Sequence, residues 1–169
     1  YIGKVKQIAE KNNSSSLKVS KSNEERLKFW AGRKAAFPAC GVLAPDYMCM
    51  DGSIPRGKLA EVLNEISRLS KKYDLPVANA FHAGDGNLHP LIMFDANNPE
   101  SLRKCEEFGA DILKYCVKVG GALTGEHGVG IEKRELMCEA FNDKDIQQQL
   151  TIKVALDPNS LLNPGKVYP

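Results

Sequence analysis

The sequence predicts an α+β fold in which helices cover one face of a mostly antiparallel sheet. Several segments carry apolar residues at helical spacing, and short apolar runs typical of strands lie between them. Two of these runs flank a Gly-Asp-Gly-Asn turn, which favours a hairpin. The order of strand, helix, hairpin and helix favours a ferredoxin-like split βαβ arrangement, followed by a C-terminal helical segment.

The first predicted elements are helical. Residues Ile2–Lys11 carry apolar side chains at helical spacing, and a short strand is expected over Leu17–Ser20. Ser22 and Glu25 form a capping-box pattern, which predicts a second helix that ends near Pro38.

The central elements alternate between strands and helices. Pro55 suits the first turn of a helix, Asp51-Gly52 suits a turn, and Gly120-Gly121 suits a helix end. The expected strands are 41–50, 77–81 and 88–94, and the expected helices are 55–73 and 100–119.

The C-terminal part predicts helical segments over 131–138 and 143–155, followed by a tail rich in proline and turn residues. We therefore expect a ferredoxin-like substrate and metal domain over 1–128, with C-terminal helices and the tail over 129–169.

Composition excludes several classes of protein. The chain is 43% hydrophobic and 26% charged, and its 23 basic and 21 acidic residues are scattered, with no basic stripe suited to nucleic acid. No apolar run is long enough to span a membrane, and no signal-peptide pattern is present, which predicts a cytoplasmic protein, or one bound peripherally at the inner face of the membrane. The 5 cysteines include no C-x-x-C pair, so free thiols are expected.

The stretch "NAFHAGDGNLHP" holds two of the 3 histidines in the chain. If Asp85-Gly86 is the centre of a two-residue type I′ turn, His82 lies directly opposite His89. Opposed residues have Cβ atoms about 4.5–5.5 Å apart, close enough for two imidazoles to share a metal ion. In a wider turn this register fails, although the loop can still bring the rings together. The alternative is that each histidine is an ordinary polar residue at a strand end.

The third histidine lies in "TGEHGVG", between glycines. Glu126 can add a carboxylate to the two histidines and leave metal positions open for substrate or water. His127 then points elsewhere and acts as a base, because imidazole titrates near neutral pH. The alternative is a solvated Glu-His pair in a glycine-rich connection.

Arg33 lies between Phe29 and Phe37 at helical spacing, which places a guanidinium on an aromatic stripe. A substrate carboxylate would satisfy this cation in bidentate geometry. Equally, its stem can pack while its head group reaches water.

Five stretches together resemble a known family. "FWAGRKAAFP", "PDYMCMDGSIPR", "NAFHAGDGNLHPLIMFD", "GGALTGEHGVGIEKRELM" and "LDPNSLLNPGKVYP" are similar to the C-terminal half of FAD-linked 2-hydroxy-acid oxidases and dehydrogenases of the vanillyl-alcohol-oxidase type. The likeness is strongest to the glycolate oxidases, and it spans residues 24–169.

The resemblance implies a flavoprotein whose FAD is bound mainly by an N-terminal domain that precedes this chain, and to which the tail would return. We therefore expect a fragment that is inactive alone and binds FAD weakly. The resemblance also implies a small 2-hydroxy-acid substrate and other oxidase subunits of the iron–sulfur type as partners.

Individual positions carry the family's roles by resemblance. His82, His89 and Glu126 match the ligands of a divalent metal, zinc or a similar ion, and His127 matches the proposed base. Arg33 matches an arginine that holds the substrate carboxylate. A separate pair, Asn163 and Lys166, falls in the tail that returns to FAD in this family.

Three positions depart from relatives specific for 2-hydroxyglutarate. Phe37, Cys49 and Leu91 stand where those relatives have the threonine, lysine and asparagine that help hold a second carboxylate. The resemblance therefore implies oxidation of glycolate or D-lactate to the 2-oxo acid, with hydride transfer to flavin.

Two other interpretations remain at this point. A ferredoxin-like binding or regulatory module would carry no chemistry of its own. A metal-dependent hydrolase would use the same three ligands without flavin, and would leave the motif "NPGK" without a role.

Overall fold

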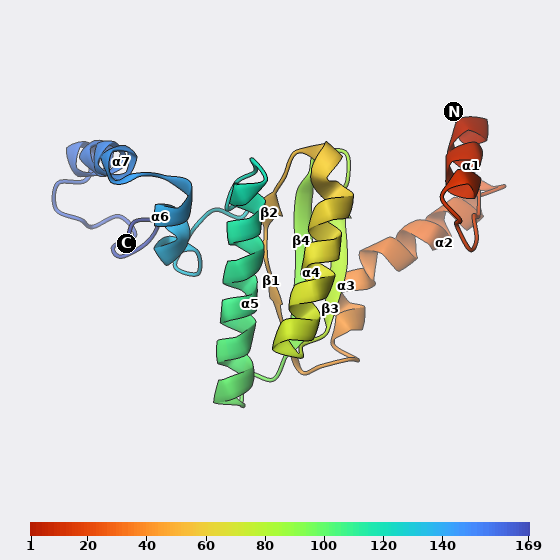
Figure 1. Ribbon diagram of the computed structural model, residues 1–169, viewed down its shortest axis with the longest axis horizontal. Coiled ribbons are helices and arrows are strands. Elements are labelled where there is room, and N and C mark those ends of the chain that lie inside the picture. Colours follow the sequence, from red (N-terminus) through yellow and green to blue (C-terminus); the bar gives the residue numbers. More distant parts are fainter. The chain divides into compact units, whose positions relative to one another are not determined.

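The structure, a computed structural model, describes residues 1–169, and no helix in it is long and apolar enough to cross a membrane. The chain forms two compact units, Tyr1–Phe37 and Pro38–Pro169. Figure 1 labels the elements of each unit. The helices are α1 (Ile2–Lys11), α2 (Asn23–Lys34), α3 (Ala36–Cys40), α4 (Leu59–Tyr73), α5 (Pro99–Lys118), α6 (Met137–Ala140) and α7 (Asp143–Leu156). The strands are β1 (Asp46–Cys49), β2 (Gly52–Ser53), β3 (Val77–His82) and β4 (Asn87–Phe94), and two 3-10 turns cover Arg56–Lys58 and Arg134–Leu136.

The first unit is helical. The predicted helix start at Ser22 is confirmed, because the Glu25 backbone N–H donates to the Ser22 hydroxyl over 3.1 Å. The reciprocal bond of a capping box differs, because the Glu25 carboxylate accepts from the Lys21 N–H and not from that of Ser22. The predicted strand over Leu17–Ser20 is wrong. No other strand pairs with this segment, and a lone extended segment has no ladder to join.

The second unit is built on β4, which lies in the middle of an antiparallel sheet. One edge of β4 pairs with β3, and the other edge pairs with β1 and then β2. A single antiparallel bridge joins Ser53 of β2 to Ala122 after α5, where a split βαβ arrangement has its last strand. This order confirms the predicted α+β fold and its split βαβ arrangement.

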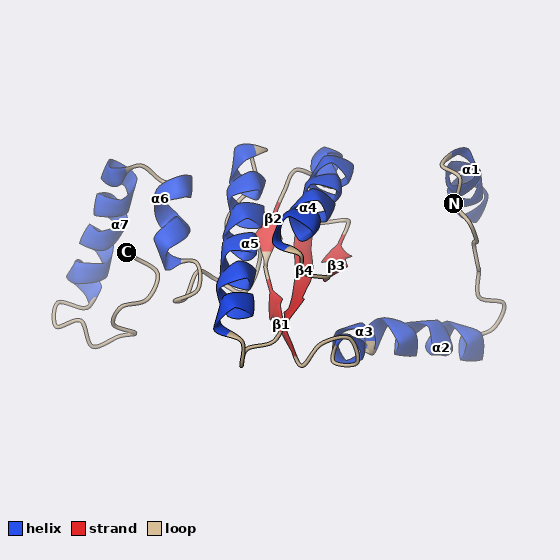
Figure 2. Ribbon diagram, turned by 60° about the horizontal axis from the view of Figure 1, so that its bottom comes forward, coloured by secondary structure: helices blue, strands red, loops and turns tan.

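Helices α4 and α5 cover one face of this sheet (Figure 2). Val62, Ile66 and Leu69 of α4 pack with Phe108 and Ile112 of α5 in the buried core. From the sheet the core receives Leu88 and Ile92, and from the C-terminal helices Met137 and Ile146. Residues 129–169 therefore share the core of residues 38–128 within one compact unit, whereas the sequence placed a boundary between them.

The predicted turn at Asp51-Gly52 is wrong. Asp51 interrupts the strand between β1 and β2, and its side chain is completely buried. Gly52 continues in β2, where an added Cβ would lie 2.9 Å from the Cys116 sulfur of α5. Because Gly52 pairs with Leu88 of β4, the chain stays in the sheet where the sequence predicted a turn.

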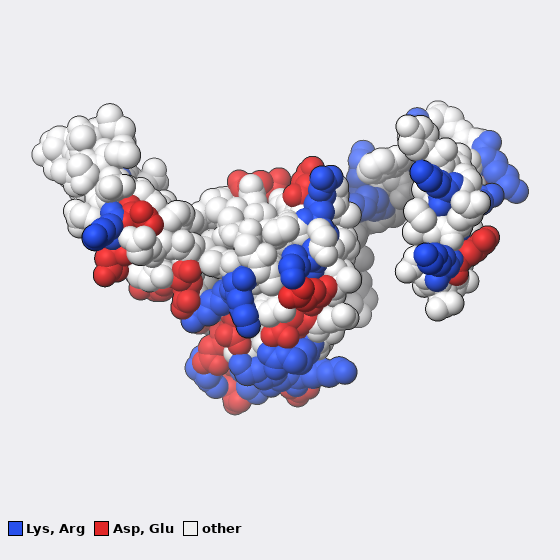
Figure 3. Space-filling view, turned by 45° about the horizontal axis from the view of Figure 1, so that its top comes forward, with Lys and Arg blue, Asp and Glu red and all other residues white.

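Figure 3 shows lysines and arginines interspersed with aspartates and glutamates over the part of the second unit that faces the viewer. On α5, exposed charges form helical pairs, such as Arg103 with Glu107 and Lys104 with Glu100. Pairs of this kind on an exposed surface contribute little to stability.

Phe108 is the largest fully buried side chain, and its ring stacks on Tyr73 at 5.5 Å between centroids. Phe108→Ala should lower the free energy of unfolding by about 3–5 kcal/mol, because it removes buried area and leaves a cavity. Denaturant unfolding measures the change, with the exposed Phe141→Ala as the matched control. If both variants lost the same free energy of unfolding, Phe108 would not be the main core side chain of α5.

Candidate functional site

The candidate site lies on the sheet face opposite α4 and α5. Leu88 and Ile92 of β4 point into the helix-covered core, so Asn87 and His89 point to the other face. In the antiparallel register, His82 pairs with Asn87 and Cys49 pairs with Leu91, which places both on this second face. Side chains that alternate along β4 therefore place core residues on one face of the sheet and candidate site residues on the other.

The hairpin register differs from the two-residue turn that the sequence favoured. His82 pairs with Asn87, and His89 pairs with Ala80, so four residues form the turn. Gly86 has φ +77°, and its carbonyl accepts a hydrogen bond from the Ile54 N–H over 2.9 Å, which ties the turn to the chain after β2. The two imidazoles are therefore diagonal neighbours, and their ring centroids lie 5.5 Å apart in an edge-to-face arrangement.

His89 is the buried centre of the site. Its Nε2 lies 2.9 Å from a Glu126 carboxylate oxygen, and its Nδ1 lies 3.7 Å from the Cys49 sulfur. Burial lowers the pKa of His89 more than the Glu126 charge raises it. Burial also raises the pKa of Cys49 to about 11, so the sulfur stays a thiol. A neutral His89 is in the state that a metal ligand requires.

Glu126 and His127 come from the glycine-rich loop after α5. The His127 ring stacks on His89 with centroids 5.2 Å apart, and its Nε2 lies 3.6 Å from the same Glu126 oxygen. The expectation that His127 points elsewhere is therefore wrong. Because the loop crosses the sheet face at β4, it delivers both side chains to one place.

Ligand atoms of Asp51, His89, Glu126 and His127 lie within 4.8 Å of one another, as do those of Cys49, His89 and His127. His82 belongs to neither group and approaches only through its ring contact with His89. Imidazole nitrogens with carboxylate oxygens form a donor set suited to zinc and similar ions.

Asn87 adds an independent sign of a ligand. Its Oδ1 is a buried side-chain acceptor without a hydrogen-bond partner. Buried polar atoms in native proteins rarely lack a partner, so this one indicates a bound group. Asn87 lines a cavity of about 350 Å³ together with His82, Glu126 and Thr124. An acceptor of this kind suits a cation or a bound hydroxyl group.

The C-terminal tail reaches the same loop. The Val167 N–H donates to the Gly130 carbonyl, and Lys166 lines a cavity of about 360 Å³ together with Cys49 and His127. Lys166 also donates to the Asn163 side chain over 3.2 Å. The sequence placed these tail residues near FAD, and the structure places Lys166 beside the histidine loop.

Arg33 lies on α2 in the first unit and is exposed. Phe29 on the same helix is 42% exposed, so the expected aromatic stripe is not buried within this unit. The role of Arg33 as a substrate ligand stays a prediction.

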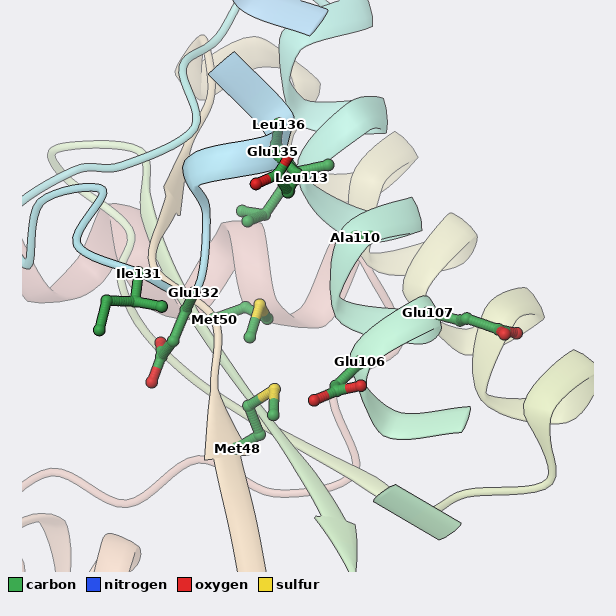
Figure 4. Close-up of a pocket in the computed structure, with 10 residues that line it drawn as sticks. All are labelled: Met48, Met50, Glu106, Glu107, Ala110, Leu113, Ile131, Glu132, Glu135 and Leu136. Atoms are coloured by element: carbon green, nitrogen blue, oxygen red, sulfur yellow. The ribbon is translucent and has the colours of Figure 1, made fainter. Parts of the chain in front are cut away.

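A larger cavity, of about 480 Å³, lies on the helix-covered side of the sheet (Figure 4). Met48 and Met50 line it together with Leu113 of α5 and Leu136. Its carboxylates belong to different segments, and Figure 4 shows Glu107 directed away from the methionines. None of the three histidines lines this cavity.

Sequence reasoning missed Asp51 and Asn87 as parts of the site, and it considered Cys49 only as a departure from relatives specific for 2-hydroxyglutarate. Asn87 had a signal, because it follows the hairpin glycine at the start of a strand whose alternate residue is His89. Asp51 had none, because its partners are distant in the chain.

Comparison with known proteins identifies the family. The sequence profile of FAD linked oxidases, C-terminal domain, matches residues 2–167. The chain belongs to this family. The glycolate oxidase subunit GlcD of Escherichia coli strain K12 is 53% identical over 98% of the chain, and the mitochondrial D-lactate dehydrogenase [cytochrome] of Arabidopsis thaliana is 37% identical over 98%. The chain spans 33% and 30% of these two relatives, or about a third of their length.

A solved structure supports the fold of this FAD-linked oxidase domain. The 4-ethylphenol oxidase from Gulosibacter chungangensis matches with a TM-score of 0.58 and 22% identity. The match covers 78% of this chain and 27% of that one. At this identity the likeness concerns the fold alone.

Gly125 allows the loop of this domain to approach β4 closely. A Cβ there would lie 2.3 Å from Asn87 Oδ1, whereas a Cβ at Gly84 in the hairpin turn would meet nothing within 4 Å. Gly125→Ala should therefore destabilise the protein by about 1–3 kcal/mol through overpacking, and Gly84→Ala should not. Thermal unfolding of the two variants compares them directly. Equal stability would contradict the close approach of the loop.

Proposed function

We propose that this chain is the substrate- and metal-binding part of an FAD-dependent 2-hydroxy-acid dehydrogenase that oxidises glycolate or D-lactate to the 2-oxo acid. The observation that carries the proposal is the meeting of His89, Glu126 and His127 on the uncovered face of the sheet. The names of the relatives, glycolate oxidase subunit and D-lactate dehydrogenase, support the same reaction class.

The residues present fit a divalent metal ion. His89 is held neutral by burial, Glu126 supplies an anionic oxygen at its Nε2, and the unpartnered Asn87 Oδ1 lines the cavity shared by His82 and Glu126. On the resemblance, the proposed metal ligands are His82, His89 and Glu126, with zinc or a similar ion as the metal. Ligand atoms of His89 and Glu126 lie within 4.8 Å of each other, and the His82 ring contacts that of His89. When bound, such an ion would supply Lewis acidity toward the 2-hydroxyl group of the substrate.

His127 would accept the proton of the substrate hydroxyl. Its ring is 51% exposed and stacks on His89, so it lies at the mouth of the site where a small acid can reach it. Arg33 would hold the substrate carboxylate in bidentate geometry and so orient the acid. FAD, when bound, would supply the acceptor of the hydride.

The tail would complete the flavin site. Lys166 carries a positive charge beside the histidine loop and contacts Asn163, which suits the anionic groups of FAD. We assign both residues to cofactor binding, with most FAD contacts supplied by an N-terminal domain. Other oxidase subunits of the iron–sulfur type are the proposed protein partners. The free thiols suit a reducing compartment, so we propose a cytoplasmic location, or the inner face of the membrane.

The first test concerns the metal. The complete protein that contains this chain should hold one metal ion per chain, and His82→Ala or Glu126→Ala should weaken metal affinity by about a hundredfold, because each removes a ligand. Metal analysis measures the content, and Glu100→Ala on the exposed start of α5 is the matched control. If the unmodified protein held no stoichiometric metal and both variants kept full activity, the ligand assignment would be overturned. A complete protein without flavin would favour a binding module instead.

The second test concerns the substrate. Leu91 is 1% exposed and lies on the site face of β4, so it offers an apolar wall and no donor to a second carboxylate. The complete protein should therefore prefer glycolate or D-lactate over D-2-hydroxyglutarate by about tenfold or more in kcat/KM. Steady-state kinetics with the three acids decides this. A preference for the dicarboxylate would show that other residues hold its second carboxylate.

A further inference from the structure

Asp51 is a buried carboxylate that none of the roles above uses. Its side chain is 0% exposed, and it lies between β1 and β2 on the same sheet face as His89. A buried charge is strongly unfavourable unless it is paired and hydrogen-bonded. The partners of Asp51 therefore indicate what the carboxylate does.

Every partner lies in one short segment after α5. The Thr124 hydroxyl donates to Asp51 Oδ2 over 2.6 Å, and the backbone N–H groups of Gly125, Glu126 and His127 donate over 3.2, 3.1 and 2.8 Å. Lys133 Nζ lies 3.3 Å from the same oxygen. Successive N–H groups that converge on one anion form a backbone nest, and here the anion belongs to the protein itself.

The direction of the pKa agrees with this geometry. Burial acts to raise the pKa of Asp51, but the hydrogen bonds from Thr124, His127 and Glu126 and the Lys133 charge outweigh it and lower the pKa. The carboxylate is thus charged wherever the protein is folded near neutral pH, and the nest keeps its anion.

Asp51 is a poor metal ligand despite its place in the cluster. Oδ2 already accepts from Thr124, His127 and Lys133, and Oδ1 accepts from the Glu126 N–H over 3.2 Å. A metal ion would have to displace several of these donors. The cluster therefore contains an anchor as well as ligands.

We propose that Asp51 is a positioning residue: its buried carboxylate fixes the backbone of residues 124–127 and so sets the places of Glu126 and His127 over His89. Lys133 balances the charge, and Thr124 extends the network by accepting from the Gly128 N–H over 2.8 Å. The proposal rests on the proposed function only in that Glu126 and His127 carry the chemistry.

Asp51→Asn in the complete protein tests the inference. The amide keeps one oxygen for the nest, but it removes the negative charge and turns an NH2 group toward the Glu126 N–H that bonds Oδ1. Hydrogen exchange of the amides of residues 125–127 should therefore accelerate by about tenfold or more, without substrate or metal. Affinity for added Zn²⁺ should fall by about ten- to a hundredfold, as for other residues that orient ligands. Asp111→Asn is the matched control, because Asp111 also pairs with a lysine and a hydroxyl, Lys72 and Tyr73, but on α5 away from the site.

Lys133→Met distinguishes two roles of Asp51, namely fixing the loop backbone and balancing the Lys133 charge. This variant leaves the Asp51 carboxylate with the Thr124 hydroxyl and the three N–H groups, so the loop amides should stay protected although stability falls. The double variant Asp51→Asn with Lys133→Met should regain stability relative to Asp51→Asn without regaining protection of the loop. Equal exchange in Lys133→Met and Asp51→Asn would overturn the proposal, because Asp51 would then be only a counter-ion.

Two further outcomes are distinguishable. Should Asp51→Asn fail to fold, Thr124→Val removes one donor and should give a smaller acceleration of the same amides; an unchanged rate would contradict the proposal. Should the unmodified protein bind no Zn²⁺ and oxidise no hydroxy acid, the proposed function fails while the exchange result still decides the role of Asp51. Exchange in Asp51→Asn equal to that in Asp111→Asn would overturn the inference alone.

Discussion

One buried carboxylate connects the sheet to the loop that carries the candidate site. Asp51 interrupts the edge strand, and its oxygens gather a hydroxyl, three consecutive backbone N–H groups and a lysine from the segment after α5. Without an anion these N–H groups would be left without an acceptor on the sheet face, and without the donors the buried charge would be unfavourable. Glu126 and His127 therefore depend on a residue that itself does no chemistry in the proposed reaction.

The sheet separates stability from function through the period of its strands. On β4, Leu88 and Ile92 join the helix-covered core, whereas Asn87 and His89 alternate with them and face the site. A shift of one residue in the register would move every one of these side chains to the opposite face. The core thus fixes the register, and the register places the histidine.

The C-terminal segment takes part in both layers. Met137 joins the core against α5, and the tail returns to the loop through the bond from Val167 to Gly130. Lys166 consequently lies at the cavity that Cys49 and His127 line. In an FAD-linked oxidase domain this arrangement brings a cationic side chain to the side of the site where the proposed base is exposed.

The sequence by itself determined the strongly periodic helices, the hairpin strands and the residue types of the site, because helical and strand periods and caps are local properties. The tertiary structure decided the rest. The hairpin turn has four residues, and Gly86 at its end bonds to Ile54, a contact that no local pattern contains. Asp51-Gly52 suits a turn locally, but Asp51 meets donors that lie 73–76 residues later in the chain. Burial and long-range hydrogen bonds exist only in the folded chain, and they give Asp51 its proposed role of holding the loop of the site.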